Sequence, residues 1–366
     1  MQSSGSSFAP GKDNPNPFPG VAALERRTGK RVQLRLGGNE SLDAPLTRLR
    51  ETFGDAFCQR ARLYGDPGAW ELRQALAQYY GFDPEHLSLD AGADAVIGLC
   101  VQALCRPGDT VVCSAGTYPT FGYFARANAC HLVEVPYRYG IEGPRVDLVL
   151  LAERARSAQA RLVYLANPDN PTGSWSAHDE VQRFIEQLPE GCLLLLDEAY
   201  LDFCPALGEG SARPLPRCVR IRSMSKSHGL AGLRIGYALA ERPLLDILER
   251  SKVHYALGGL VQYAALLALD DANNGPAIIE RNAELRLRFS EHLRTLGQRP
   301  LQSGTNFVSF ELPTNESAER VQARLLEAGI AVHRPQHRAF QHLIRVTLCQ
   351  ASITSGFLER LREVLP

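Results

Sequence analysis

Residues 192–200 read Cys-Leu-Leu-Leu-Leu-Asp-Glu-Ala-Tyr, so five apolar residues run directly into two acids. A continuous apolar run of this length is typical of a strand buried on both faces of a parallel sheet. Between such runs lie segments with helical periodicity, for instance residues 91–103 and 177–187. Repeated strand–helix units predict an α/β fold with a mostly parallel sheet flanked by helices. The other strand-like runs are residues 110–113, 132–135, 161–165, 219–222 and 236–239.

The pattern changes after about residue 242, where long Arg/Leu/Glu/Ala helices such as residues 278–296 begin. A strand-like segment at 306–312, a helix at 317–328 and two short strands then predict a smaller α+β domain. A chain of 366 residues is long enough for about two domains. We therefore predict a disordered tail over residues 1–17, an N-terminal arm over 18–45, a large domain over 46–242, and linking helices with a small domain over 243–366.

Composition excludes several classes of partner. Lys+Arg and Asp+Glu balance at 40 each, which leaves no excess positive charge to hold a nucleic acid or an anionic membrane. The chain has no apolar window of about 18 residues, and its N-terminus has no basic start followed by an apolar stretch, so neither a membrane span nor a signal peptide is predicted. The nine cysteines are scattered without a CxxC pair, which favours reduced thiols in a cytoplasmic protein, and we predict no metal site. The expected partners are small molecules and a second copy of the chain.

Lysine is rare in this chain, with four lysines against thirty-six arginines. One of them, Lys226, lies in the segment 221–234, Ile-Arg-Ser-Met-Ser-Lys-Ser-His-Gly-Leu-Ala-Gly-Leu-Arg. Partial burial and a nearby cation such as Arg234 would favour the neutral amine that a Schiff-base nucleophile requires. A solvated loop lysine is the alternative if this segment is taken alone.

Polar residues around Lys226 are suited to a phosphate group. The hydroxyls of Ser223 and Ser225 and the guanidinium of Arg234 can donate to a dianion from one side. In residues 90–94, Asp-Ala-Gly-Ala-Asp, the glycine predicts a helix start whose free N–H groups point at an anion. An ordinary polar turn and an ordinary helix start are the alternatives.

Asp197 ends a buried apolar run, so its ionised carboxylate needs a positive partner. A protonated pyridine nitrogen is such a partner, and the pair keeps the ring electron-poor. Tyr200 and Asn170, the latter in the turn Asn-Pro-Asp-Asn-Pro-Thr-Gly at 167–173, could donate to the oxygen of the same ring. A strand-end helix cap and a structural turn remain open as alternatives.

In this order, the motifs resemble those of class I/II aminotransferases of fold type I, which depend on pyridoxal 5′-phosphate (PLP), and most closely the histidinol-phosphate aminotransferase branch. The resemblance covers about residue 34 to the C-terminus. It rests on these residues: Asn39-Glu40 with Pro45, Tyr64-Gly-Asp-Pro67, Gly92-Ala-Asp94, Tyr118, Asn170-Pro-Thr-Gly173, Asp197-Glu-Ala-Tyr200, Ser225-Lys226, Gly232-Leu-Arg234, and Arg345 in Leu-Ile-Arg-Val-Thr.

The resemblance implies a role for each of these residues. Lys226 would carry PLP as a Schiff base and shuttle the substrate proton, and Asp197 would pair with the ring nitrogen. The remaining cofactor contacts would be Asn170 and Tyr200 at the ring oxygen, Tyr118 on the ring face, Ser223, Ser225, Arg234, Gly92, Ala93 and Asp94 at the phosphate, and Tyr64 from the other subunit of a homodimer. Arg345 would bind the substrate carboxylate through its fork of donors, and Asn39, Tyr255 and His333 would line the substrate site.

One position departs from the family pattern. Histidinol-phosphate aminotransferases carry an arginine for the substrate phosphate after a Gly-Ile-x-x stretch, whereas this chain has His333 in Gly-Ile-Ala-Val-His-Arg. Arg334, His337 or Arg338 could compensate, or the segment is a solvated basic loop. Histidinol phosphate is therefore in doubt as a substrate.

The activity that the resemblance implies is transfer of an amino group, with glutamate as the expected donor and a keto acid or other carbonyl compound as acceptor. The first alternative is a decarboxylase of an amino-acid phosphate, of the threonine-phosphate type, on the same fold. A noncatalytic PLP-binding transcription regulator is disfavoured, because only about 30 residues precede the matching region, too few for a helix-turn-helix domain.

Overall fold

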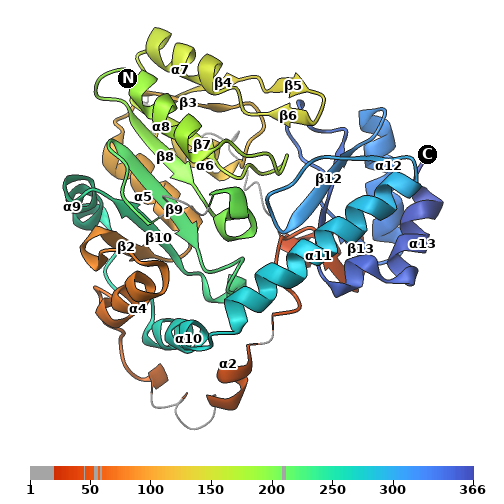
Figure 1. Ribbon diagram of the computed structural model, residues 1–366, viewed down its shortest axis with the longest axis horizontal. Coiled ribbons are helices and arrows are strands. Elements are labelled where there is room, and N and C mark those ends of the chain that lie inside the picture. Colours follow the sequence, from red (N-terminus) through yellow and green to blue (C-terminus); the bar gives the residue numbers. More distant parts are fainter. Residues whose placement is uncertain (1–19, 45, 53–56, 58–59, 208–211) are drawn as a thin grey trace, which may run out of the picture.

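The computed structural model describes residues 20–44, 46–52, 57, 60–207 and 212–366 (Figure 1). The predicted tail over residues 1–17, Pro45 of the motif set and Cys58 lie outside the described residues. The eight cysteines within them are all buried and free, in agreement with the predicted reduced thiols. No helix of the described part of the chain is long and apolar enough to cross a membrane.

A seven-stranded sheet organises the first two-thirds of the chain, in the order β2-β10-β9-β8-β7-β3-β4. All neighbouring pairs from β4 to β9 are parallel, whereas β10 is antiparallel to both β9 and β2. The mostly parallel sheet predicted from the sequence is therefore confirmed. The strands are β2 (Leu87–Asp90), β3 (Thr110–Ser114), β4 (His131–Val135), β7 (Leu162–Ala166), β8 (Leu193–Asp197), β9 (Cys218–Ser223) and β10 (Gly236–Ala240).

Helices cover both faces of this sheet. On one face lie α5 (Ala93–Leu104), α6 (Thr120–Ala127) and α9 (Arg242–Ser251), and on the other α7 (Leu148–Ser157) and α8 (His178–Gln187). Successive strand residues belong to different cores, since Leu193 and Leu195 pack on the first face and Leu194 and Leu196 on the second. This two-sided burial is why strand β8 reads as an unbroken apolar run.

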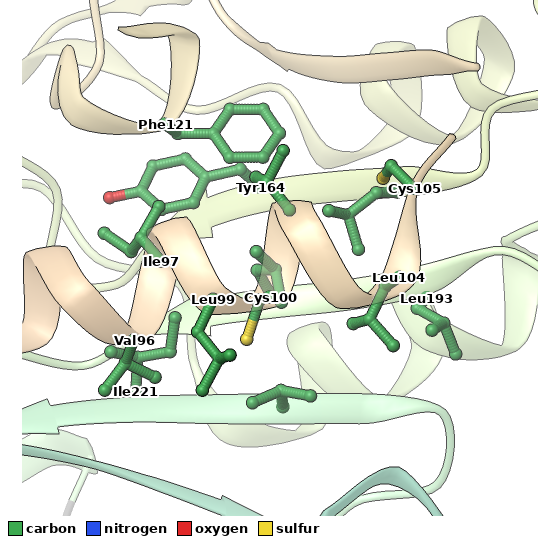
Figure 2. Packing of buried hydrophobic residues seen from close by; sticks show 14 of the residues in the cluster. Val96, Ile97, Leu99, Cys100, Leu104, Cys105, Phe121, Tyr164, Leu193 and Ile221 are labelled. Atoms are coloured by element: carbon green, nitrogen blue, oxygen red, sulfur yellow. The ribbon is translucent and has the colours of Figure 1, made fainter. Parts of the chain in front are cut away.

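Helix α5 is the central helix of the first face. Figure 2 shows Val96, Ile97 and Cys100 of this helix packed with side chains of the sheet and with Phe121 of α6. The Phe121 ring stacks on the Tyr164 ring of β7 with the centroids 4.9 Å apart. This packing fixes the helix so that its N-terminus lies at the strand ends where the candidate site is formed.

The β2–β10 edge of the sheet is covered by α4 (Trp70–Tyr80) and α10 (Gly259–Asp270), which pack on each other. The short helices α1 (Gly20–Thr28) and α2 (Thr47–Thr52) precede them in the chain. A small hairpin of β5 (Arg138–Gly140) and β6 (Gly143–Arg145) extends beyond the β4 edge.

The C-terminal third forms a second core around a three-stranded sheet, seen to the right in Figure 1. Strand β1 from the N-terminal region joins this unit by pairing in parallel with β13. The predicted strand 306–312 and helix 317–328 are confirmed within two residues at each end. The domain division at about residue 242 stays a prediction. The elements are β1 (Leu34–Leu36), α11 (Asn274–Thr295), β11 (Arg299–Pro300), β12 (Phe307–Glu311), α12 (Asn315–Glu327), β13 (Ile330–Val332), β14 (Leu343–Thr347) and α13 (Ser355–Val364).

Candidate active site

Three of the predicted site residues lie at the carboxyl ends of three parallel strands of the large sheet. Asn170 follows β7, Asp197 ends β8, and Lys226 follows β9. In open α/β sheets this edge is where ligands bind, because the loops after neighbouring strands converge there. The antiparallel strand β10 returns directly from the Lys226 loop and brings Arg234 to the same edge.

Lys226 lies partly buried, and its amine meets the N-terminal segment. Its Nζ donates to the carbonyl of Asn39 at 3.1 Å, and the backbone carbonyl of Lys226 accepts from the hydroxyl of Ser41 at 2.6 Å. Burial, with a further contribution from the Arg345 guanidinium, lowers the pKa of Lys226 to about 8. An amine with this pKa is neutral in a substantial fraction of molecules near physiological pH, as a nucleophile requires.

Asp197 is a buried carboxylate without a cation. Its oxygens accept from the Tyr164 hydroxyl at 2.7 Å and from the backbone N–H of Ala199 at 3.0 Å, and among the described residues it forms no ion pair. Burial raises the pKa of Asp197 to about 6, although the Tyr164 hydroxyl opposes that shift. A buried acid in this state would be stabilised by a positively charged ligand atom.

The neighbouring acid shows what a satisfied carboxylate looks like in the same region. Glu198 lies 2.6 Å from the guanidinium of Arg220 and 3.0 Å from that of Arg222, and all three side chains are buried. The two guanidinium groups overcome the effect of burial and lower the pKa of Glu198. Glu198 is therefore part of the protein framework, whereas Asp197 is open to a ligand.

The predicted phosphate-binding residues converge at the start of α5. Gly92 precedes this helix with φ 91°, and a Cβ built on it would lie 2.6 Å from Nη2 of Arg234. Arg234 also donates to the Ser225 hydroxyl at 3.4 Å, and the Ser225 N–H donates to the Ser223 hydroxyl at 3.1 Å. A helix N-terminus, two hydroxyls and a guanidinium thus form one cradle, with Ala93 as the first helical residue.

Two phenols and the amide of Asn39 complete the site. The Tyr118 hydroxyl donates to Asp94 at 2.8 Å, which places this ring beside the cradle. The Tyr200 hydroxyl accepts from the side-chain amide of Asn39 at 2.9 Å, so the proton of this phenol is free for another acceptor. Asn39 is itself held by Thr347, whose hydroxyl accepts from the Asn39 N–H at 2.9 Å.

Arg345 is a buried guanidinium without a carboxylate partner in the described part of the chain. Nη1 donates to Oδ1 of Asn170 at 2.5 Å, Nη2 donates to the carbonyl of Gly37 at 2.7 Å, and Nε has no partner. Burial lowers the pKa of Arg345 to about 10. An incoming carboxylate would therefore find an unsatisfied donor and a charge that needs compensation.

Tyr64 and Tyr255 lie apart from this constellation, at the surface. Their rings contact each other with centroids 4.9 Å apart, and the residues are 86% and 47% exposed. Neither forms a contact with the Lys226 loop of its own chain in the described residues.

Sequence reasoning missed several residues that shape the site. Tyr164 supplies the hydroxyl on Asp197, and its sequence signal is a phenol within an otherwise aliphatic strand. Asn306 donates to the carbonyl of Asn39, which also accepts from Lys226. No sequence signal marks Asn306, because its partner lies 267 positions away.

These residues fit PLP. The unpaired Asp197 suits the ring nitrogen, the Lys226 amine suits the aldehyde, and the cradle around Gly92 and Arg234 suits the phosphate. The fit rests on unsatisfied groups of the protein, namely a buried acid without a cation and a buried guanidinium without an anion.

Comparisons with known proteins agree with this geometry. The family model "Aminotransferase class I and II" matches residues 31–365, so the chain belongs to the class I and II aminotransferases, and it is a PLP-dependent enzyme of fold type I. A histidinol-phosphate aminotransferase from Lactiplantibacillus plantarum is 30% identical over 94% of this chain and 95% of the relative. An aromatic amino acid aminotransferase from Corynebacterium efficiens is also 30% identical, over 90% of this chain and 93% of the relative.

Among solved structures, the histidinol-phosphate aminotransferase from Sinorhizobium meliloti in complex with pyridoxal-5′-phosphate superposes with a TM-score of 0.84. It is 33% identical, and the match covers 95% of this chain and 94% of that chain. The predicted family, fold and cofactor are thereby confirmed. Relatives with two different substrates match at the same identity, so overall identity does not choose the substrate.

Proposed function

We propose that this aminotransferase moves the amino group of glutamate to a keto acid or other carbonyl acceptor, with Lys226 as its catalytic residue. The observation that carries this proposal is the environment of the Lys226 amine. It is partly buried, donates to one carbonyl oxygen of the described residues, and has a pKa lowered to about 8 by burial and by Arg345. Such an amine can both attach to an aldehyde and exchange a proton at neutral pH.

PLP, when bound, supplies the aldehyde and an electron-poor ring that stabilises negative charge at the substrate's α-carbon. Asp197 would hold the ring nitrogen in its protonated form, because the buried carboxylate is stabilised by that charge. Tyr164 would support this pairing by donating to the carboxylate at 2.7 Å. The neutral amine of Lys226 would remove the proton from the substrate's α-carbon and would then deliver that proton to the cofactor.

Two donors remain for the ring oxygen. Asn170 uses its Oδ1 to accept from Arg345, so its amide N–H group is left to donate. Tyr200 accepts from Asn39 and retains its own proton. Both residues would therefore donate to the ring oxygen, and Tyr118 would contact the ring face.

Arg345 would bind the substrate's α-carboxylate. Its Nε–H is free, and each of its Nη atoms keeps a second hydrogen, so the guanidinium can still present a fork of two donors. Asn170 and the carbonyl of Gly37 fix the plane of that fork. The substrate is thereby oriented with its α-carbon toward Lys226.

A homodimer is the second part of the proposal. Large apolar side chains are exposed around residues 63–70 and 253–255, where Leu63 is 71%, Tyr64 86% and Val253 72% exposed. Covering these side chains with a second copy would remove apolar surface from water, and Tyr64 would then reach the other subunit's phosphate cradle. We place the enzyme in the cytoplasm, since its buried cysteines are free thiols.

The test of the activity is a half-reaction. Mixing the purified PLP-bound enzyme with glutamate alone should convert bound PLP to pyridoxamine phosphate, seen by its absorbance, with one equivalent of 2-oxoglutarate released. Lys226→Ala should abolish that conversion while PLP is still retained through noncovalent contacts. In a parallel reaction with threonine phosphate in place of glutamate, release of carbon dioxide without formation of a keto acid would instead support the decarboxylase alternative.

The shared site is tested by mixing two inactive variants, Lys226→Ala and Tyr64→Ala. If Tyr64 acts across the dimer, hybrid dimers regain one intact site, and about a quarter of the sites become active at equal mixing. Activity that stays at the level of the separate variants would contradict the shared site.

A further inference from the structure

The segment 333–338, whose role the sequence leaves open, begins beside the proposed carboxylate site. His333 pairs with Arg345 in an antiparallel bridge, with N···O distances of 3.1 and 2.8 Å. Arg334 donates to a glutamine of α12 at 3.4 Å, His337 lies 3.6 Å from an acid of β4, and Arg338 is exposed. His333 therefore belongs to the substrate site already proposed, and the other three form no hydrogen bond or ion pair with Arg345 within the described structure.

A cluster of polar side chains next to Lys226 has no role in the site described so far. The two residues that follow the lysine, Ser227 and His228, are buried with exposures of 3% and 2%. Tyr80, the last residue of α4, and Asp202, from the short 3-10 helix Leu201–Phe203, meet them there. These four residues are the Asp202 cluster.

The Asp202 carboxylate is the central acceptor of this cluster. Its Oδ2 accepts from the hydroxyl of Ser227 and, at 3.1 Å, from the hydroxyl of Tyr80. The Tyr80 oxygen also lies 2.8 Å from Nε2 of His228. The phenol of Tyr80 thus joins the acid to the imidazole.

The protons of this chain of hydrogen bonds follow from the strength of the acceptors. A carboxylate is the stronger acceptor, so the proton of Tyr80 belongs to the bond with Asp202. Burial lowers the pKa of His228, although Asp202 opposes that shift. The imidazole is therefore neutral, and its Nε2–H donates to the Tyr80 oxygen.

The Asp202 cluster joins the two loops that carry the proposed chemistry. Asp202 lies two residues after Tyr200, on the loop that follows β8, whereas Ser227 and His228 directly follow Lys226 after β9. A shift of one loop relative to the other would stretch the hydrogen bonds of Asp202. The cluster therefore fixes the distance between the lysine loop and the loop that would hold the cofactor ring.

Further elements restrict His228. Nδ2 of Asn274, at the start of α11, donates to the His228 carbonyl at 3.1 Å. The rings of Tyr79 and Tyr80 face the imidazole edge-on, with centroids 5.4 and 6.1 Å away. Helix α11 continues from this point toward the C-terminal core (Figure 1). The residue two positions after the lysine is thus held through both its side chain and its backbone.

We propose that the Asp202 cluster positions Lys226, by holding the lysine loop against the loop of Asp197 and Tyr200 so that the amine reaches both substrate and cofactor. The inference rests on the proposed function, because it takes Lys226 as the proton carrier. Proton transfer requires a narrow geometry, and a displacement of about 1 Å can lower a rate by about 100-fold. The residues of the cluster are positioning residues, since none of them contacts the amine itself in the described structure.

The first test is Tyr80→Phe, which removes the hydroxyl between Asp202 and His228 and keeps the ring stacked on Phe82. In the PLP-bound variant, the maximal rate at which glutamate converts the cofactor should fall by about 10- to 100-fold. KM for glutamate and Kd for PLP should stay within about threefold of the wild type, because the phosphate cradle and the carboxylate site are unchanged. Ser227→Ala, which removes the other hydroxyl from Asp202, should act in the same direction.

The apoprotein provides a readout without turnover, namely the pH at which modification of Lys226 by an amine reagent reaches half its maximal rate. Burial lowers the pKa of Lys226 to about 8. Besides burial, the charges that act on the amine belong to Arg345, Asp94, Arg234 and Glu40. Tyr80→Phe changes none of these charges. An amine that is no longer held in place is better solvated, so the midpoint should rise by about half a pH unit or more.

Tyr79→Phe is the matched control. It removes a hydroxyl from the neighbouring residue, whose ring also packs on His228, but that hydroxyl forms no hydrogen bond with a described residue. This variant should keep the wild-type rate and the wild-type midpoint. All rates are measured well below the melting temperature of each variant. A Tyr80→Phe enzyme that melts earlier but converts the cofactor at the wild-type rate would overturn the inference, because the cluster would then only stabilise the fold. A loss of rate accompanied by tenfold weaker binding of PLP would also overturn it.

The two proposals can fail separately. If glutamate converts the cofactor equally fast in the wild type, Tyr80→Phe and Ser227→Ala, the aminotransferase proposal stands and the role of the Asp202 cluster is wrong. If glutamate does not convert the wild-type cofactor, the proposed function fails. In that case the midpoints of Lys226 modification in the apoproteins still decide whether the cluster holds the amine.

Discussion

Replacing Asp197 by asparagine should make the apoprotein more stable at neutral pH while weakening its hold on PLP. In the folded chain burial raises the pKa of Asp197 from 3.8 to about 6, a shift of about 2 units. At 1.36 kcal/mol per unit, ionising this group in the folded state costs about 3 kcal/mol relative to the unfolded chain. Asparagine, which has a similar shape and no charge, removes that cost.

The direction in which the stability of the wild type changes with pH follows from proton binding at Asp197. Between pH 3.8 and about 6, the folded chain holds a proton on Asp197 that the unfolded chain has already lost. The contribution of this group to stability is therefore complete at low pH, falls as the pH rises through that window, and stays low above it. The advantage of Asp197→Asn should appear over the same window and level off at higher pH.

The assay is thermal unfolding of PLP-free protein from pH 4 to 8, for the wild type and for Asp197→Asn. For a chain of this size, about 2 °C per kcal/mol predicts that the variant gains about 5 °C relative to the wild type across the window. Asp246→Asn, a half-exposed change on α9, is the control and should show no such trend.

With PLP bound, the wild type should be more stable than Asp197→Asn, because the protonated ring nitrogen then compensates the buried charge of the carboxylate. Losing this charge-assisted contact should weaken PLP binding by about 10- to 100-fold, measured by titrating the apoproteins with PLP. A stability difference that does not change with pH, or equal PLP affinity, would refute the assignment of Asp197 as a carboxylate held ready for a cation.

Three further predictions concern the framework, the cradle and the lysine. Glu198→Gln leaves two buried guanidinium groups without their acid, so it should destabilise the folded enzyme by about 3–5 kcal/mol, measured by denaturant unfolding; an effect below about 1 kcal/mol would contradict this. Gly236→Ala would place a Cβ 2.3 Å from backbone atoms at the start of α5, so it should lower both the melting temperature and the affinity for PLP. Gly232→Ala is the control: its Cβ would meet no atom within 4 Å, so the melting temperature should not change. In the apoprotein, the rate at which an amine reagent modifies Lys226, followed by peptide mass spectrometry, should reach half its maximum near pH 8. Arg345→Gln removes a nearby cation and should move that midpoint to higher pH. A downward shift would show that the guanidinium does not act on the amine.

Much of the large sheet could be predicted from local pattern. The first four residues of strand β8, Leu193 to Leu196, alternate between two apolar cores, so all four must be apolar. Strand β2, in contrast, has only four residues and two of them are polar, and it was not identified. The reversed direction of β10 also escaped prediction, since the segment 224–235 before it contains only turns and a short 3-10 helix rather than a crossover α-helix.

In the candidate site, too, some residues could be predicted from local sequence and others could not. Residue type and order sufficed to single out Lys226, Asp197 and Arg234, because each motif lies at the end of a recognisable strand or helix. The Tyr164 hydroxyl on Asp197 and the Asn170 amide on Arg345 join residues 33 and 175 positions apart. Such partners are chosen by packing and leave no local pattern.

The amino-acid sequence by itself determined the α/β class, the strands with two buried faces and the identity of the chemical groups, since these depend on periodicity and on residue type. Only the tertiary structure decided that, among the described residues, Asp197 forms no ion pair with a cation and Arg345 none with an anion. These properties arise from contacts between segments far apart in the chain and from the loss of water around them. No single stretch of residues determines those contacts or that loss of water.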